Sequence, residues 1–160
     1  MIAAVVLAAG ASSRYGTSPP KQQVFAPRVL EALRASSVDS ILVVAGAHPV
    51  DVDAQIVECP DWERGPGASL RCGLARLSRD VDAALVVLAD GPDLDPHAID
   101  RVIGAWDGGG AVAASYGGVR LHPVLLPRAV WSRVPDEGAR GIDARLVPCD
   151  DLREPGDVDE

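Results

Sequence analysis

The sequence is poor in aromatic side chains, with one Phe, two Tyr and three Trp among its 160 residues. This scarcity removes the stacking platform that proteins use to bind single-stranded nucleic acid. Basic residues are also few, 15 Lys and Arg against 23 Asp and Glu, and the formal net charge is −8. Duplex DNA and anionic membranes attract clustered basic residues, so we expect no nucleic acid and no membrane as a partner. A small ligand is the better expectation.

Cysteine is scarce as well, and the three cysteines stand far apart without a second Cys or His at metal-ligand spacing. We interpret them as reduced thiols of a cytoplasmic protein. The apolar run at residues 1–9 has no basic segment before it and leads into a loop rich in Gly and Ser, so we predict a strand there and no signal peptide. No other apolar run approaches the roughly 18 residues of a membrane span.

Apolar runs of strand length alternate with amphipathic stretches of helix length, which predicts an α/β fold with a mostly parallel sheet covered on both faces. The length suits one domain, and we expect it to cover residues 1–160. Asp95 is the expected N-cap of one helix and Pro27 the start of another, while Gly117 and Gly118 predict a hairpin that allows one antiparallel strand. We predict strands at residues 2–8, 41–45, 53–57, 83–88, 111–115, 124–126 and 145–147, helices at 27–35, 67–77, 95–106 and 127–133, and a polar tail at 154–160.

The loop after the first strand, residues 7–16 (LAAGASSRYG), is the first candidate ligand site. Its small residues let the backbone approach a ligand, its amides can cradle phosphate oxygens, and Arg14 and the later Lys21 supply positive charge. The loop is neither the dinucleotide fingerprint GxGxxG nor a Walker A loop. From these residues alone, a phosphate-binding loop and a plain strand-to-helix turn are equally supported.

Acidic residues form two further candidates. Asp90 follows the strand predicted at residues 83–88, and a carboxylate held there suits magnesium, although an Asp that caps the turn before Pro92 has the same pattern. Asp157 and Asp159 belong to the polar tail, where acidic residues are usually solvated. Paired with Asp90, they would complete a metal site.

Together these segments resemble the MobA-like nucleoside triphosphate transferases, most closely the molybdenum cofactor cytidylyltransferase branch. Residues 7–16 with Lys21 are similar to the family's LAAG-x-S-x-R-M-G-x-x-K signature. The other matching segments follow in the family's order: residues 60–63 (PDWE) and 67–74 (GASLRCGL) for NPDW and SLRxGL, 88–92 (LADGP) for DQP, 122–125 (HPVL) for HPV, 138–140 (GAR) for GAR, and 157–159 (DVD) for DID.

The resemblance implies a three-layer, Rossmann-like nucleotidyltransferase fold with a mostly parallel central sheet. It also implies an enzyme that moves a nucleoside monophosphate onto a phosphorylated acceptor such as molybdopterin and releases pyrophosphate. LAAG in place of LAGG favours CTP over GTP as the donor. Mg2+ is the implied cofactor and a molybdoenzyme an implied partner.

The resemblance also assigns roles to individual residues. Arg14 contacts the leaving pyrophosphate, Lys21 contacts the α-phosphate, and Asp90 holds the metal. These three form the catalytic set, and Asp90, Asp157 and Asp159 form the metal set. The implied nucleotide-binding residues are Leu7, Ala8, Ala9, Gly10, Ser13, Arg14, Lys21, Ser69 and Arg71.

Some positions depart from the family pattern. Four residues instead of two separate Gly16 from Lys21, residues 22–26 (QQVFA) replace a longer glycine-containing connection, and Gly91 replaces the glutamine of DQP. The sequence also ends where the family continues into a closing helix, so we expect a compact form with shortened loops and a truncated C-terminal end. Two alternatives stay open: a nucleotide-binding protein of this fold without catalysis, and a relative of the kind labelled oxidoreductase, although no dinucleotide or flavin motif is visible.

Several side chains have a structural interpretation beside the functional one. His122 precedes a proline and has no orienting carboxylate nearby in the sequence, so we interpret it as structural. Arg71 lies on a helix that also needs a solvated face, which leaves its place in a pocket open. The three tryptophans, Trp62, Trp106 and Trp131, are interpreted as packing residues.

Overall fold

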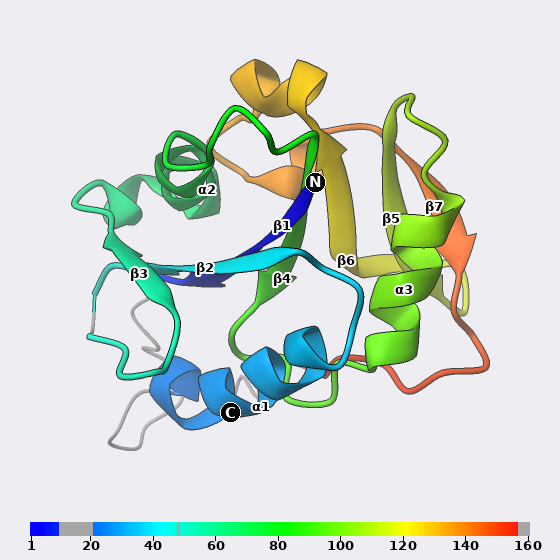
Figure 1. Cartoon of the computed structure of the whole chain (residues 1–160), viewed down its shortest axis with the longest axis horizontal. Coiled ribbons are helices and arrows are strands. Elements are labelled where there is room, and N and C mark those ends of the chain that lie inside the picture. Colours follow the sequence, from blue (N-terminus) through cyan, green and yellow to red (C-terminus); the bar gives the residue numbers. More distant parts are fainter. Residues whose placement is uncertain (10–20, 48, 157–160) are drawn as a thin grey trace.

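A seven-stranded sheet forms the centre of the fold in the computed structural model, which describes residues 1–9, 21–47 and 49–156. The strands are β1 (Ile2–Ala8), β2 (Ser40–Ala45), β3 (Gln55–Glu58), β4 (Ala83–Leu88), β5 (Ala111–Tyr116), β6 (Val119–Pro127) and β7 (Ala144–Pro148). Their spatial order is β3-β2-β1-β4-β6-β5-β7 (Figure 1). Strands β1 and β4 therefore lie side by side in the interior of the sheet.

The sheet is mostly parallel, as the sequence predicted. Strands β3, β2, β1 and β4 pair in parallel, and β7 pairs in parallel with β5, whereas β6 runs antiparallel to both β4 and β5. The hairpin between β5 and β6 turns at Gly117 and Gly118, whose φ angles of 59° and 81° suit a tight two-residue turn. This turn gives the sheet its antiparallel strand.

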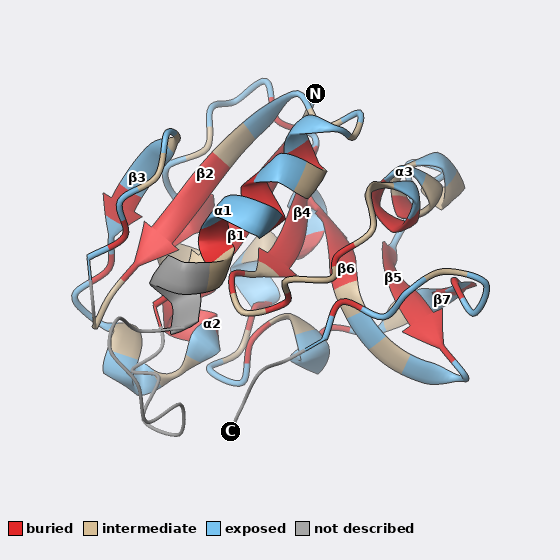
Figure 2. Cartoon of the chain, turned by 90° about the horizontal axis from the view of Figure 1, so that it is seen from below, coloured by how far each residue is buried: buried red, intermediate tan, exposed pale blue. Residues whose placement is uncertain are grey.

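Helices cover both faces of the sheet and give the fold three layers. Helices α1 (Lys21–Arg34) and α3 (Pro96–Ala105) lie on one face, and α2 (Pro66–Leu74) lies on the other (Figures 1 and 2). Three short 3-10 helices complete the described elements: η1 (Trp62–Arg64), η2 (Arg128–Arg133) and η3 (Ala139–Gly141). Among the helices of the described ranges, none is long and apolar enough to cross a membrane.

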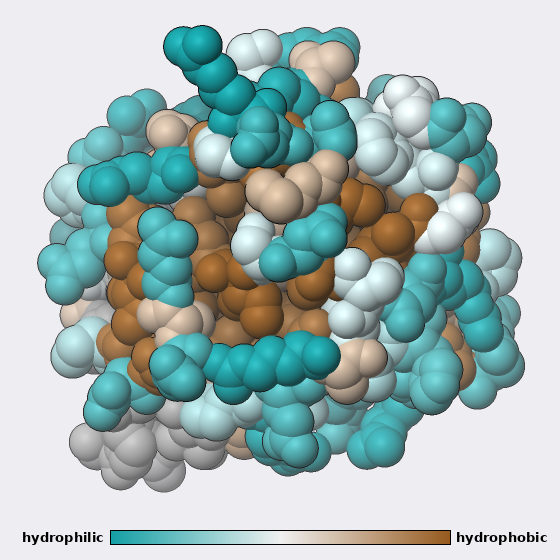
Figure 3. Space-filling view, viewed as in Figure 1, coloured by the Kyte–Doolittle hydropathy of each residue, from teal (hydrophilic) through white to brown (hydrophobic). Residues whose placement is uncertain are grey.

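Alternate residues of the central strands pack into two separate apolar cores. In β1, Ala4 and Val6 face α1 and α3, whereas Val5 faces α2, and all three side chains are fully buried. Both faces of a covered parallel sheet demand apolar residues, which explains the continuous apolar runs in the sequence. On the face seen in Figure 3, apolar residues gather over the strands and polar residues surround them.

The first helix begins earlier than predicted. The sequence favoured a start at Pro27, but α1 begins at Lys21 and contains Pro27 in its interior. A proline inside a helix lacks one backbone hydrogen bond and usually ends or kinks it. Here tertiary packing outweighs that cost, because Ala26, Val29 and Leu33 are fully buried against the sheet.

The other elements match the prediction with shifted ends. The strands predicted at residues 2–8 and 83–88 are confirmed, and the Asp95 side chain caps α3 by accepting a hydrogen bond of 2.8 Å from the His97 amide. Strand β6 is longer than predicted, α2 is shorter, and residues 128–133 form a 3-10 helix. The described part of the predicted tail packs on the fold, because Pro155 is buried and its carbonyl accepts a hydrogen bond of 2.8 Å from the Asp93 amide.

The Tyr116 hydroxyl is buried without a hydrogen-bond partner among the described residues, and burial raises the pKa of this side chain. A buried hydroxyl without a partner costs about 1–3 kcal/mol. We therefore expect Tyr116→Phe to raise the free energy of unfolding by about 1 kcal/mol, as measured by urea denaturation. A loss of stability of similar size would instead show that the hydroxyl is hydrogen-bonded in solution.

Candidate functional site

An open cleft of about 340 Å³ lies where β1 and β4 end. After β1 the chain continues to β2 on one side of this strand pair, and after β4 it continues to β5 and β6 on the other side, so the strand order reverses between β1 and β4. Open α/β sheets bind ligands at such positions, beyond the carboxyl ends of the strands. The cleft is lined by Leu7, Ala9, Trp62, Glu63, Gly65, Pro66, Ser69, Leu88 and Asp90.

The floor of the cleft consists of the ends of the two central strands. The Ala89 amide donates a hydrogen bond of 3.0 Å to the Leu7 carbonyl, and the Ala47 amide donates one of 3.2 Å to the Ala9 carbonyl. These bonds hold the backbone that follows β1 against both of its neighbours. Ala9 is small and 5% exposed, so a ligand on this floor would meet backbone more than side chain.

Trp62 reaches the floor because Gly46 has no side chain. A Cβ atom at Gly46 would lie 2.6 Å from the Trp62 Cβ and 2.8 Å from the Ala9 carbonyl oxygen. Trp62 is half-buried and contributes an apolar surface to the cleft. The interpretation of Trp62 as a packing residue is therefore incomplete, since the same side chain also lines the candidate site.

The wall formed by η1 and the start of α2 is anchored to the segment that follows η2. The Gly67 amide donates a hydrogen bond of 2.9 Å to the Asp136 carbonyl. The Arg71 guanidinium donates to the Val134 carbonyl at 2.9 Å and to the Asp136 carboxylate at 2.6 Å. This ion pair lowers the pKa of Asp136. Arg71 thus ties the wall to the rest of the fold.

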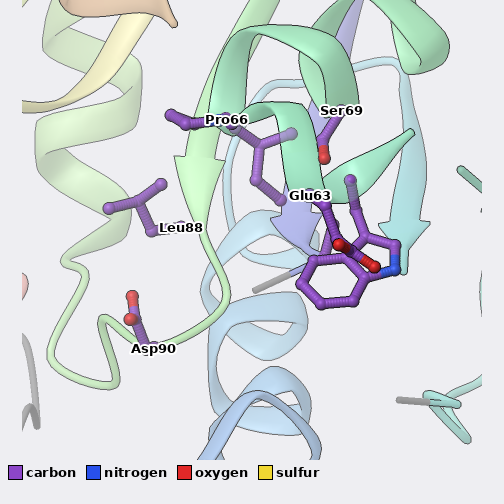
Figure 4. A pocket seen from close by; sticks show the side chains of 9 residues that line it. Glu63, Pro66, Ser69, Leu88 and Asp90 are labelled. Atoms are coloured by element: carbon purple, nitrogen blue, oxygen red, sulfur yellow. The ribbon is translucent and has the colours of Figure 1, made fainter. Parts of the chain in front are cut away.

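Asp90 projects from the loop after β4 and faces this wall (Figure 4). Two turns shape the loop, because the Gly91 amide donates to the Leu88 carbonyl and the Leu94 amide donates to the Gly91 carbonyl, each at 3.3 Å. Asp90 is half-buried, and Glu63 stands on the opposite side of the cleft. None of the nine lining residues is basic, so the described lining offers two carboxylates and no positive charge.

Three distant segments meet behind Asp90. A Cβ atom at Gly91 would lie 2.8 Å from Cε1 and 2.9 Å from Nε2 of His122, and 3.2 Å from the Gly156 carbonyl oxygen. The loop after β4, strand β6 and the residues that lead to Asp157 therefore converge on one point. Sequence reasoning treated His122 as structural, and no pattern in the sequence pairs it with Gly91.

The structure brings together only some of the predicted site residues. Leu7, Ala9, Ser69 and Asp90 line the cleft, whereas Ala8 is buried in the core beneath it. Arg71 is not among the lining residues. Lys21 is the first residue of α1, and its side chain lies outside the described part, as do Gly10, Ser13, Arg14, Asp157 and Asp159.

Sequence reasoning did not single out Glu63, Gly65, Pro66 and Leu88 as site residues. The signal available for the first three was their position at the start of α2, where Gly65 is the N-cap and Pro66 is the first residue of the helix. Within the described ranges, no group of three or more His, Cys, Asp and Glu residues could hold a metal ion. A metal ion at Asp90 would therefore need further ligands from a substrate or from residues beyond those ranges.

Cysteine chemistry does not contribute to the cleft. All three cysteines are free thiols, and Cys59 and Cys72 line a separate hollow on the other side of η1 and α2. Burial raises the pKa of Cys72 to about 11, with a further contribution from the Cys59 thiol beside it. A thiol with this pKa stays protonated near neutral pH and is a poor nucleophile.

Comparison with known proteins points to one family. The family model described as "MobA-like NTP transferase domain" matches residues 4–147. The chain is 29% identical over 159 residues to the bifunctional protein GlmU of Mycolicibacterium vanbaalenii, covering 88% of this chain and 32% of that protein. It is 32% identical over 161 residues to the bifunctional enzyme IspD/IspF of Maricaulis maris, covering 91% of this chain and 38% of that protein. The chain thus spans about a third of the length of these curated relatives.

Solved structures share the fold. The crystal structure of Rv0371c from Mycobacterium tuberculosis H37Rv in complex with manganese superposes with a TM-score of 0.70 at 23% identity. That match covers 92% of this chain and 87% of the other. At this level of identity the likeness concerns the arrangement of strands and helices.

Proposed function

This chain belongs to the MobA-like NTP transferase domain family and is on that ground a nucleotidyltransferase domain, and we propose that it transfers a nucleoside monophosphate from CTP to a phosphorylated acceptor such as molybdopterin. An oxygen of the acceptor phosphate attacks the α-phosphorus of the triphosphate. The bond from the α-phosphorus to the bridging oxygen breaks, and pyrophosphate leaves. The observation that carries the proposal is Asp90 facing the η1–α2 wall across a cleft at the ends of β1 and β4.

The nucleoside lies on the cleft floor in this proposal. The backbone around Ala8, Ala9 and Gly10 reads the base, and Ser69 contributes a hydroxyl from α2. Trp62 adds an apolar surface beside Ala9, which suits the flat ring of a base. Cytidine is favoured over guanosine because the loop has LAAG rather than LAGG, the distinction that the family resemblance supplies.

Asp90 holds a divalent cation, with Mg2+ as the proposed ion. A carboxylate is the oxygen donor that magnesium prefers beside phosphate oxygens, and the described lining of the cleft contributes two carboxylates that attract a cation. When bound, the cation neutralises charge on the triphosphate. The closeness of the Gly156 carbonyl to Gly91 supports Asp157 or Asp159 as a second ligand, since Asp157 is the next residue in the chain and Asp159 comes two residues later. The manganese complex of the structural relative supports a divalent ion at this fold.

Charge neutralisation and positioning perform most of the work in such a transfer. Arg14 contacts the leaving pyrophosphate, and Lys21 contacts the α-phosphate, where negative charge accumulates. Lys21 is the first residue of α1, the next described element after β1 in the chain. Arg71 is left out of the proposed nucleotide contacts because its guanidinium binds Val134 and Asp136 instead.

The test is pyrophosphate release from each of the four ribonucleoside triphosphates with Mg2+, with and without molybdopterin. We expect release with CTP that depends on the acceptor, and weaker release with GTP. No release with any triphosphate would contradict the transferase proposal. Calorimetric binding of CTP without release would then identify a nucleotide-binding protein without catalysis.

A further inference from the structure

The strand β6 changes its register next to the candidate site. In its pairing with β5, Ala113 lies opposite Val124, but Ser115 lies opposite Arg120. Three residues of β6, 121–123, thus stand where β5 has only Ala114. Extra residues in one strand form a bulge, and bulges beside active sites commonly redirect a side chain. His122 is the middle residue of this bulge.

The bulge lies beside the end of β4. The pairing of β4 with β6 reaches Val86 opposite Val124, and both the bulge and the loop with Asp90 lie just beyond that pair. The imidazole of His122 is thereby directed at the backbone of Gly91, as the 2.8 and 2.9 Å separations from a Cβ at that position show. Two segments with no sequence proximity are thus brought into contact behind Asp90.

Position 91 needs a glycine because a side chain there would collide with the His122 ring, and not because its backbone has a positive φ angle. The glycines with positive φ in the described ranges are at other positions, so Gly91 adopts a backbone that other residues can adopt. The His122 ring occupies the space that a side chain at position 91 would need. Gly91 is buried, and the ring on one side and the Gly156 carbonyl on another leave it no room to shift.

We propose that His122 is a positioning residue that holds the Asp90–Gly91 backbone in place, so that the Asp90 carboxylate points at the cation in the cleft. This proposal rests on the proposed function, since it takes Asp90 as the metal ligand. The ring acts by contact with the next residue in the chain, and a shift of Gly91 moves Asp90 with it. Outer-shell groups that fix the orientation of a metal ligand, commonly by hydrogen bonding, contribute 10- to 100-fold to metal affinity, and we expect an effect at the lower end of this range for a ring that acts by contact.

The experiment compares Mn2+ binding in the presence of CTP, by electron paramagnetic resonance, for the wild type, His122→Ala, Gly91→Ala and the double variant. We expect each single variant to raise the Mn2+ concentration at half saturation about tenfold. The double variant should bind Mn2+ better than Gly91→Ala and melt at a higher temperature, because the methyl group at position 91 fills space that the ring has left. His97→Ala is the matched control, since this imidazole lies on α3 and is 80% exposed.

Each outcome separates the two proposals. Wild-type binding of Mn2+ with equally tight binding by His122→Ala would overturn the positioning role and leave the proposed function standing. The positioning role would also be overturned if the effects of the two single changes on Mn2+ affinity and on melting temperature simply added up in the double variant. Additive effects would mean that the two residues are not in contact. A wild type that binds no Mn2+ with CTP would remove the metal site itself, and the positioning role with it.

Discussion

Asp90→Asn is expected to lower pyrophosphate release from CTP by about 100- to 1000-fold while leaving the fold intact. The amide keeps the size of the side chain but loses the negative charge that would hold the cation. Removing one preorganised electrostatic group from an active site typically has an effect of this size. The measurement is a steady-state pyrophosphate assay at saturating Mg2+, with melting temperature as the check on folding.

Asp93→Asn is the matched control, because it makes the same chemical change three residues further along the chain. The Asp93 carboxylate pairs with Arg28 at 3.3 Å and with Arg153 at 3.4 Å, and it is 38% exposed. Exposed pairs of this kind are worth about 0–1 kcal/mol, so activity should stay within a few-fold of the wild type. Equal losses in both variants would mean that Asp90 acts through the loop and not through its carboxylate.

Gly67→Ala is expected to lower the free energy of unfolding by roughly 3 kcal/mol or more. A Cβ atom at Gly67 would lie 1.7 Å from the Pro135 carbonyl oxygen and 2.7 Å from the Asp136 Cα. Both are backbone atoms, so the conflict cannot be relieved by rotating a side chain. Separating the two segments would also break the hydrogen bond from the Gly67 amide to the Asp136 carbonyl. Urea denaturation followed by circular dichroism measures the loss.

Gly104→Ala provides the contrasting case. Gly104 lies in α3, and a Cβ atom there would meet nothing within 4 Å. Alanine is a better helix former than glycine by about 1 kcal/mol, so this variant should be somewhat more stable than the wild type. If Gly67→Ala were as benign as Gly104→Ala, the wall of the cleft would not be anchored to residues 135 and 136.

The sequence predicted the core elements well because their signals are local. Strands β1 and β4 are uninterrupted apolar runs, and Asp95 before a proline is a strong helix start. The predicted start of α1 at Pro27 was wrong. It rested on the local rule that proline is favoured in the first turn of a helix. The packing of Ala26 and its neighbours against the sheet, which overrides that rule, depends on residues far away in the chain.

The candidate site was predictable where it follows strand ends and not where it depends on contacts between distant segments. Ala9 and Asp90 come one and two residues after the ends of buried strands, so their place at the edge of the sheet follows from the α/β pattern. Ser69 and Arg71 were both expected near the nucleotide, yet residues two apart on a helix point in different directions. Ser69 lines the cleft, and Arg71 binds Asp136. The approach of His122 to Gly91 depends on a register change that no local pattern encodes.

The position of β1 and β4 within the sheet determines which parts of the site can adapt to a ligand. Both strands are bonded to neighbours along both edges and covered on both faces, so their backbones open only when a large part of the sheet opens. The surface beneath a bound nucleoside is consequently preorganised, and ordering it costs little entropy on association. Adjustment to substrates of different size then falls to side chains of the cleft wall, such as Glu63, and not to the strands beneath the ligand.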